Sequence, residues 1–84
     1  LNDRVPRFLP PGTRVAHKTG TLSGFRNDAG IIYVDDTQHV AITIFSEWDS
    51  KAVKGDPAAE RQRMYDVDSA FGHIARAVFD YYSV

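Results

Sequence analysis

Two apolar stretches in the middle of the chain read as β-strands that are apolar on both faces. Residues 29–34 read Ala-Gly-Ile-Ile-Tyr-Val, and residues 39–47 read His-Val-Ala-Ile-Thr-Ile-Phe-Ser-Glu. A strand with one face in water alternates apolar and polar side chains, and neither stretch does so cleanly. The sheet that these strands form therefore needs cover on both faces.

A third strand is predicted over residues 13–19, where Arg14 and Lys18 interrupt small and β-branched residues. Residues 35–38, Asp-Asp-Thr-Gln, have the length and chemistry of a solvated hairpin turn, so the two later strands are expected to pair antiparallel. The ten-residue link over 20–29 permits a second antiparallel return through a longer loop, which Asn27 and Asp28 would shape.

The C-terminal third of the chain predicts one long helix. Asp56 is a good N-cap and Pro57 suits the first helical position. Apolar residues then recur every three or four positions, which predicts a helix to Tyr82, roughly 39 Å long at about 1.5 Å per residue. This stripe consists of Met64, Val67, Phe71, Ile74, Val78 and Tyr81. Gly72 weakens the helix by about 1 kcal/mol without breaking the pattern.

These elements predict an α/β (α+β) fold, with a three-stranded antiparallel sheet and one C-terminal helix. One helix covers one face of the sheet. The other face, and one or both sheet edges, need a partner, which is either a further segment of the same protein or a second copy of this chain. Residues 1–12 hold three of the four prolines and are expected to form a surface arm.

Composition excludes several classes of protein. Lys and Arg number 10 against 11 Asp and Glu, a net charge of −1, which is no footprint of a nucleic-acid partner. The chain has no cysteine, which removes disulfides, thiolate metal sites and cysteine nucleophiles. No apolar run approaches the ~18 residues of a membrane span. No histidine has a second ligand at metal spacing, so neither a metal nor another cofactor is expected.

One stretch has the clearest chemical meaning in the sequence. It consists of Lys18, Thr19 and Gly20, followed by Thr21. The ammonium of Lys18 would meet a substrate carboxylate as a point charge. Gly20 would let a ligand approach the backbone, so that the N–H of Thr21 could point at a developing oxyanion. A lysine on a strand is usually only solvated, and the tripeptide alone is common. His17 should point to the opposite face of the strand and pack behind the site.

Residues 9–21, Leu-Pro-Pro-Gly-Thr-Arg-Val-Ala-His-Lys-Thr-Gly-Thr, closely resemble the lead-in and third (KTG) motif of class A serine β-lactamases, which are penicillin-recognising serine hydrolases. The resemblance continues through residues 27–33 and ends with a C-terminal helix, as the family does. It covers essentially the whole chain but only the last third of a family member. It implies that residues 1–84 are the C-terminal segment of such a domain, with the arm (1–12), three strands (13–47) and helix (56–82).

The resemblance also implies roles for individual residues. Lys18 and Thr19 would bind the carboxylate of the β-lactam, with Gly20 and Thr21 completing the substrate-binding strand. Lys18 would tune the electrostatics of catalysis, and the backbone N–H of Thr21 would be one of two oxyanion donors.

The family places a further cation near the substrate carboxylate, at positions that vary between members. Arg26 is the nearest candidate, and Arg61 or Arg63 are others. Leu22 stands where many members have glycine, which affects the expected substrate spectrum.

The family's other catalytic parts are absent from these residues. No serine has a lysine three positions on, and neither Ser-Asp-Asn nor the glutamate loop is present. Without a nucleophile and a base, no acyl-enzyme forms. The expected partner is the N-terminal segment of the same hydrolase, or a second copy, and the expected ligand is a β-lactam. The family usually works outside the cytoplasmic membrane, which implies a periplasmic or secreted protein and a place in antibiotic resistance.

Two alternatives stay open from the sequence. A penicillin-binding D,D-peptidase uses the same three motifs on D-Ala-D-Ala peptides. A non-catalytic binding or sensor module could also keep this fold.

Overall fold

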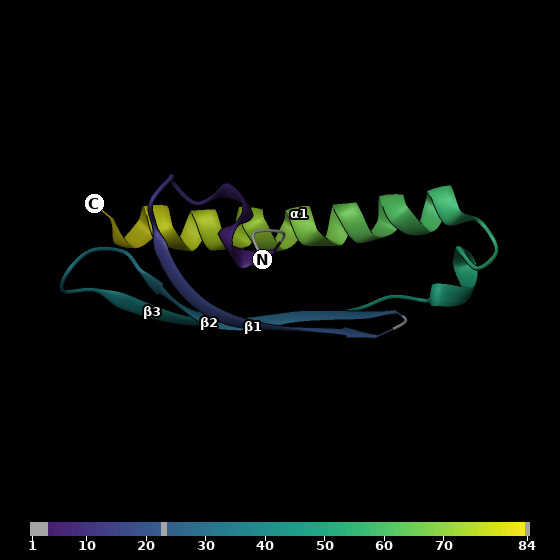
Figure 1. Cartoon of the computed structure of the whole chain (residues 1–84), viewed down its shortest axis with the longest axis horizontal. Coiled ribbons are helices and arrows are strands. Elements are labelled where there is room, and N and C mark those ends of the chain that lie inside the picture. Colours follow the sequence, from purple (N-terminus) through teal and green to yellow (C-terminus); the bar gives the residue numbers. More distant parts are fainter. Residues whose placement is uncertain (1–3, 23, 84) are drawn as a thin grey trace.

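The structure is a computed structural model that describes residues 4–22 and 24–83. Its sheet consists of β1 (Arg14–Leu22), β2 (Phe25–Tyr33) and β3 (His39–Glu47) in that order, with both neighbouring pairs antiparallel. One long helix and the N-terminal arm lie on the same side of the sheet (Figure 1). This arrangement confirms the predicted fold class. The other elements are the 3-10 turn η1 (Val5–Phe8), the 3-10 turn η2 (Ser50–Ala52) and the helix α1 (Pro57–Tyr82).

The first hairpin is longer than the sequence predicted. β1 continues past Thr19 to Leu22, and β2 begins at Phe25, so the predicted ten-residue link is wrong. The pairing runs unbroken from Arg14 opposite Tyr33 to Leu22 opposite Phe25. The KTGT stretch (residues 18–21) therefore lies wholly within β1, next to its last residue, and no part of it belongs to a loop.

Tertiary contacts explain why loop-forming residues sit in this hairpin. Gly20 lies opposite Asn27, and a Cβ at Gly20 would fall 2.5 Å from Oδ1 of Asn27, so the amide fills the space that a side chain would need. Asp28 is fully buried and accepts a hydrogen bond from the arm. Packing of this kind overrides the poor strand propensity of Gly, Asn and Asp.

The second hairpin and the helix follow the predictions. β3 has the predicted bounds, and Oδ1 of Asp35 accepts bonds from the backbone N–H groups of Thr37 and Gln38 in the turn before it. The side chain of Asp56 caps α1 by accepting from the N–H of Ala59 at 3.1 Å.

Arg4, Val5 and Leu9 of the N-terminal arm are buried, which corrects the expectation of a surface arm for this part; Pro11 and Gly12 are exposed, and residues 1–3 lie outside the described residues. Val5 is fully buried and Leu9 is nearly so, and both cluster with Ile32 of β2 and Ala75 of α1. The backbone N–H of Val5 also donates to the carboxylate of Asp28 at 3.1 Å. Proline fixes the local backbone of the arm, but burial of its apolar side chains decides where the arm lies.

The buried face of α1 differs from the predicted stripe. Phe71 is buried as expected, whereas Ile74 and Tyr81 are 47% and 72% exposed. Three further positions outside the stripe are buried, namely Asp68, Gly72 and Ala75. The arm crosses the helix on this side, where the ring of Phe8 packs against Gly72 and stacks on His73 with 4.4 Å between ring centroids. A small residue is needed where the arm crosses the helix.

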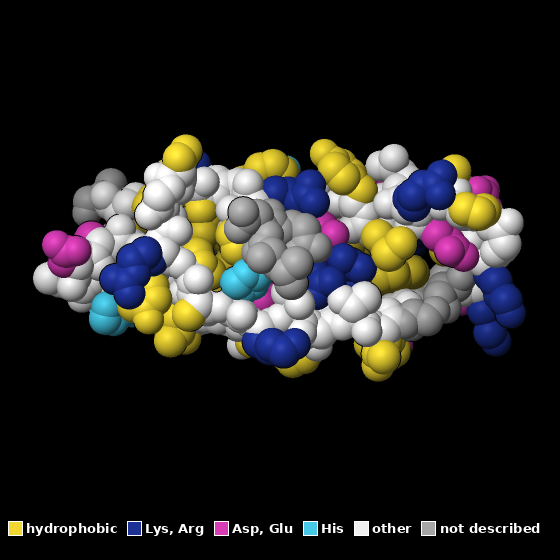
Figure 2. Space-filling model, viewed as in Figure 1, with side chains coloured by type: hydrophobic (Ala, Val, Ile, Leu, Met, Phe, Trp, Pro, Cys, Tyr) yellow, Lys and Arg dark blue, Asp and Glu magenta, His cyan; other side chains and the backbone are white. Residues whose placement is uncertain are grey.

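The face of the sheet turned away from α1 carries exposed apolar side chains, and hydrophobic groups protrude on that side of the molecule (Figure 2). Leu22 and Phe45 are 73% and 77% exposed, and Phe25 and Ile31 are also exposed. Nothing among residues 4–22 and 24–83 covers this face, so the apolar second face that the strand patterns predicted is exposed in the described part of the chain. Within that part of the chain, no helix combines the length and apolar character needed to cross a membrane.

Candidate active site

The KTGT stretch lies on β1, which occupies one edge of the sheet. Alternation along the strand divides the stretch between two faces. Lys18 is exposed on the face turned away from α1, and its ammonium donates to the carbonyl oxygen of Thr19 at 2.7 Å. The expectation that His17 points to the face opposite Lys18 is confirmed, and His17 shares that helix-facing side with Thr19 and Thr21.

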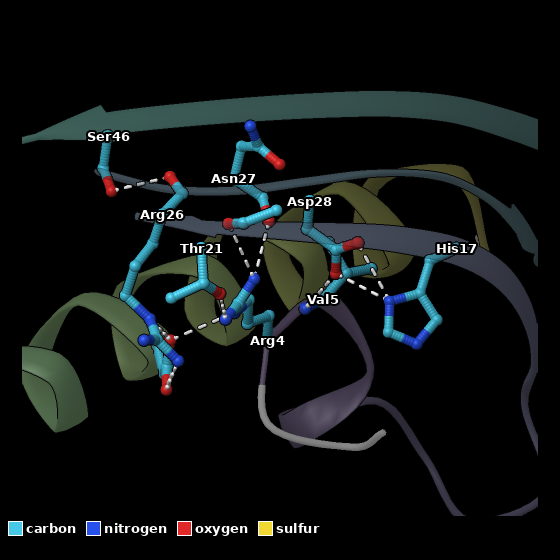
Figure 3. A network of polar contacts seen from close by, with 10 residues as sticks. Arg4, Val5, His17, Thr21, Arg26, Asn27, Asp28 and Ser46 are labelled. Carbon is cyan, nitrogen blue, oxygen red and sulfur yellow. Dashed lines mark hydrogen bonds and ion pairs between the residues drawn. The ribbon is translucent and has the colours of Figure 1, made fainter. Parts of the chain in front are cut away.

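Arg4 connects the N-terminal arm to this stretch from the helix-facing side of the sheet (Figure 3). Its Nη1 donates to the carbonyl oxygens of Gly20 at 3.1 Å and of Asn27 at 2.9 Å. Its Nη2 donates to Oγ1 of Thr21. One buried guanidinium thus holds the end of β1 against β2.

Asp68 of α1 is the counter-charge of Arg26 and Arg4 on the helix-facing side of β1. Its two carboxylate oxygens accept from Nε and Nη2 of Arg26 at 2.7 and 3.0 Å, a bidentate pair. Nε of Arg4 lies 3.4 Å from the same carboxylate. All three side chains are less than one-tenth exposed. Two guanidinium groups therefore share one carboxylate, and the buried carboxylate of Asp28 lies close by, so the four buried charged side chains balance formally.

The three arginines named from the sequence occupy different places. Arg26 lies on β2 directly opposite Thr21, so the structure brings it beside the KTGT stretch with Asp68 as its partner. Arg61 is exposed and Arg63 is half-buried, both in the first two turns of α1.

A second buried carboxylate, that of Asp28, lies on β2 opposite Thr19 and supports β1 from the helix-facing side. Both oxygens of Asp28 lie 2.9 Å from Nδ1 of His17, and one of them also accepts from the N–H of Val5. Asp28 thereby joins the arm, β1 and β2 at one point (Figure 3). Among the described residues no group of three His, Cys, Asp or Glu side chains could hold a metal ion.

Sequence reasoning missed Arg4 and Asp68. A signal for Asp68 was present, because it stands three residues before Phe71 on the buried side of the helix, and a buried carboxylate requires a partner. Arg4 had no such signal, because its position depends on how the arm folds back over the sheet.

Comparison with known proteins identifies the family. A search of curated proteins finds no significant match. A family model described as "Beta-lactamase enzyme family" matches residues 1–82. Since this match spans nearly the whole chain and includes the KTGT stretch with its supporting arginines, the chain belongs to the β-lactamase enzyme family.

Proposed function

We propose that this chain is the C-terminal part of a class A-like serine β-lactamase that hydrolyses the β-lactam amide through an acyl-enzyme. The observation that supports this most strongly is the pair of buried guanidinium groups of Arg4 and Arg26. Both lie against the carboxylate of Asp68, next to Thr21 on the helix-facing side of the sheet. These two cations lie on the helix-facing side of β1, and Lys18 projects from the other face of the same edge strand. Such a strand is suited to a substrate that presents an anionic carboxylate beside its reacting carbonyl.

In this proposal Lys18 and Thr19 bind the substrate carboxylate. Arg4 and Arg26 supply the further cation that the family places nearby. Because both are nearly dehydrated, their field at Thr21 is screened less by water and salt than that of an exposed arginine.

Arg4 also bears on the oxyanion donor. The C=O of Gly20 and the N–H of Thr21 belong to one peptide unit, and in a planar trans peptide these two groups point in opposite directions. The hydrogen bond from Arg4 to the carbonyl of Gly20 therefore holds the N–H of Thr21 pointing away from Arg4. A fixed donor of this kind stabilises developing negative charge without reorganising during the reaction.

The nucleophilic serine and its base are proposed to lie in an N-terminal segment of the same hydrolase, which would cover the exposed face of the sheet. Leu22, Phe25 and Phe45 form an apolar surface on that face. A second copy of this chain is the alternative occupant of the surface.

The test is acylation of the complete protein. Incubation with a slowly turned-over penicillin should add the mass of one β-lactam in an intact mass spectrum, and peptide mapping should place the adduct on a serine outside residues 1–84. A protein that neither forms an adduct nor hydrolyses a chromogenic cephalosporin would exclude the proposal, and so would an adduct within this segment. Acylation by a D-Ala-D-Ala peptide with negligible β-lactam turnover would identify a D,D-peptidase instead.

A further inference from the structure

A cavity of about 620 Å³ opens beside the candidate active site, between the β1–β2 turn and the start of α1. Two of its lining residues, Thr21 and Arg26, belong to the site described above. Leu22 and Gly24 line it from the β1–β2 turn. The remaining walls are Trp48, Lys51, Val53 and Lys54 in the segment after β3, and Glu60 and Met64 in the first turns of the helix.

The lining combines an aromatic side chain with an excess of basic groups. Lys51, Lys54 and Arg26 face a single acidic residue, Glu60. Since Arg26 is already paired with Asp68, the two lysines are the cations that decide which charge the cavity favours. Basic side chains project at this end of the molecule, where α1 begins (right in Figure 2). Trp48 and Met64 supply a flat, polarisable surface suited to a planar group.

The position of Trp48 is fixed by the fold. Its backbone N–H donates to the carbonyl of Gly24 at 2.9 Å, which joins the end of β3 to the β1–β2 turn. Lys51 and Lys54 follow within the loop that begins with η2, where the carboxylate of Asp49 accepts from the N–H of Lys51 at 2.9 Å. The cavity is therefore built from structured segments that meet at the Thr21 end of β1.

We propose that this cavity is a subsite for a planar, anionic group, carried by the substrate beyond the carboxylate that the KTGT stretch binds. The assignment to substrate rests on the proposed function, whereas the chemistry of the cavity does not. Trp48 would stack on the planar group, and Lys51 and Lys54 would attract its charge.

The first test measures binding without turnover. The probe is 1-naphthalenesulfonate, titrated into the complete protein by calorimetry, with uncharged naphthalenemethanol as its matched control. The double variant K51Q/K54Q should weaken sulfonate binding by about tenfold. Each solvent-exposed pair of a lysine with the sulfonate contributes up to about fivefold to the affinity. The charge-preserving variant K51R/K54R and the distant variant R14Q should bind as the wild type does. The variant E60Q should bind the sulfonate more tightly.

The second test uses substrates. We expect kcat/KM to be higher for a penicillin whose aromatic side chain bears a carboxylate than for the same penicillin whose side chain lacks that carboxylate. K51Q/K54Q should reduce the ratio of the two kcat/KM values about tenfold. It should leave kcat/KM for the penicillin without the side-chain carboxylate unchanged. Equal binding of the sulfonate by wild type and K51Q/K54Q, or an unchanged substrate ratio, would overturn the subsite. Absence of all hydrolysis together with lysine-dependent sulfonate binding would refute the proposed function and support the subsite.

Discussion

Nη1 of Arg4 lies 3.1 Å from the carbonyl oxygen of Gly20, so a side chain of the N-terminal arm fixes the strand that carries the KTGT stretch. The same guanidinium reaches Thr21 and lies near Asp68. The arm is thereby part of the candidate active site as well as part of the core.

Replacing Arg4 by lysine should impair substrate recognition. A lysine ammonium lacks the planar fork that serves Gly20, Asn27 and Thr21 together. We expect R4K to lower kcat/KM by about tenfold for a β-lactam with a free carboxylate, and by less for its methyl ester. The exposed Arg14→Lys change, on the face of β1 turned away from the arm, serves as control. An equal loss for acid and ester would mean that Arg4 acts only on stability.

The carboxylate of Asp68 is expected to be a large contributor to stability. Asp68→Asn would leave Arg4 and Arg26 buried without a counter-charge, which costs about 3–5 kcal/mol in comparable buried pairs. Asp66→Asn, on the exposed side of the same helix, should change the free energy of unfolding by less than about 0.5 kcal/mol. Urea unfolding of the complete protein measures both, and similar values for the two variants would contradict this account.

Gly72 is expected to tolerate no larger residue while the arm is docked. Alanine is about 1 kcal/mol better than glycine within a helix. A Cβ at this position would, however, lie 2.6 Å from Cδ2 of Phe8. We therefore expect G72A to destabilise the protein by about 1–3 kcal/mol. In an F8A background the same change should be neutral or stabilising. A G72A cost that is independent of Phe8 would show that the arm does not decide it.

The β2–β3 turn should lose stability in acid through Asp35. Hydrogen bonds from the Thr37 N–H, then from the side chains of Gln38 and Thr37, lower the pKa of this carboxyl below its ordinary value of 3.8. A depressed folded-state pKa means that the stabilisation is complete above the ordinary value and is lost as the pH falls through the folded value. The stability difference between wild type and D35N should therefore be constant near neutral pH and shrink below pH 3.8. A difference that does not change with pH would contradict this.

The sequence predicted those parts of the fold that depend on local signals. Asp56 and Pro57 marked the start of α1, and the turn at Asp35 set the pairing of β2 with β3. Patterning also identified a sheet with one uncovered face. The course of the arm was not predictable in this way, because it depends on tertiary contacts of Val5 and Arg4.

The same division applies to the candidate site. The KTGT stretch was found because its residues are adjacent in sequence. Arg4 and Asp68 are 64 positions apart and meet only when the arm and α1 pack on the same side of the sheet. The first hairpin was placed wrongly because Gly20, Asn27 and Asp28 favour loops locally and are held in strands by their partners.

The most direct test of the central claim is the rate of β-lactam hydrolysis by the complete protein carrying Lys18→Ala. Arg14→Ala is the matched control, since Arg14 is exposed on the same face of the same strand. If Lys18 binds the substrate carboxylate, K18A should lower kcat/KM for carboxylated β-lactams at least about tenfold, or about 1.4 kcal/mol, and R14A should not. An unchanged kcat/KM in K18A would remove Lys18 from the active site and contradict the account.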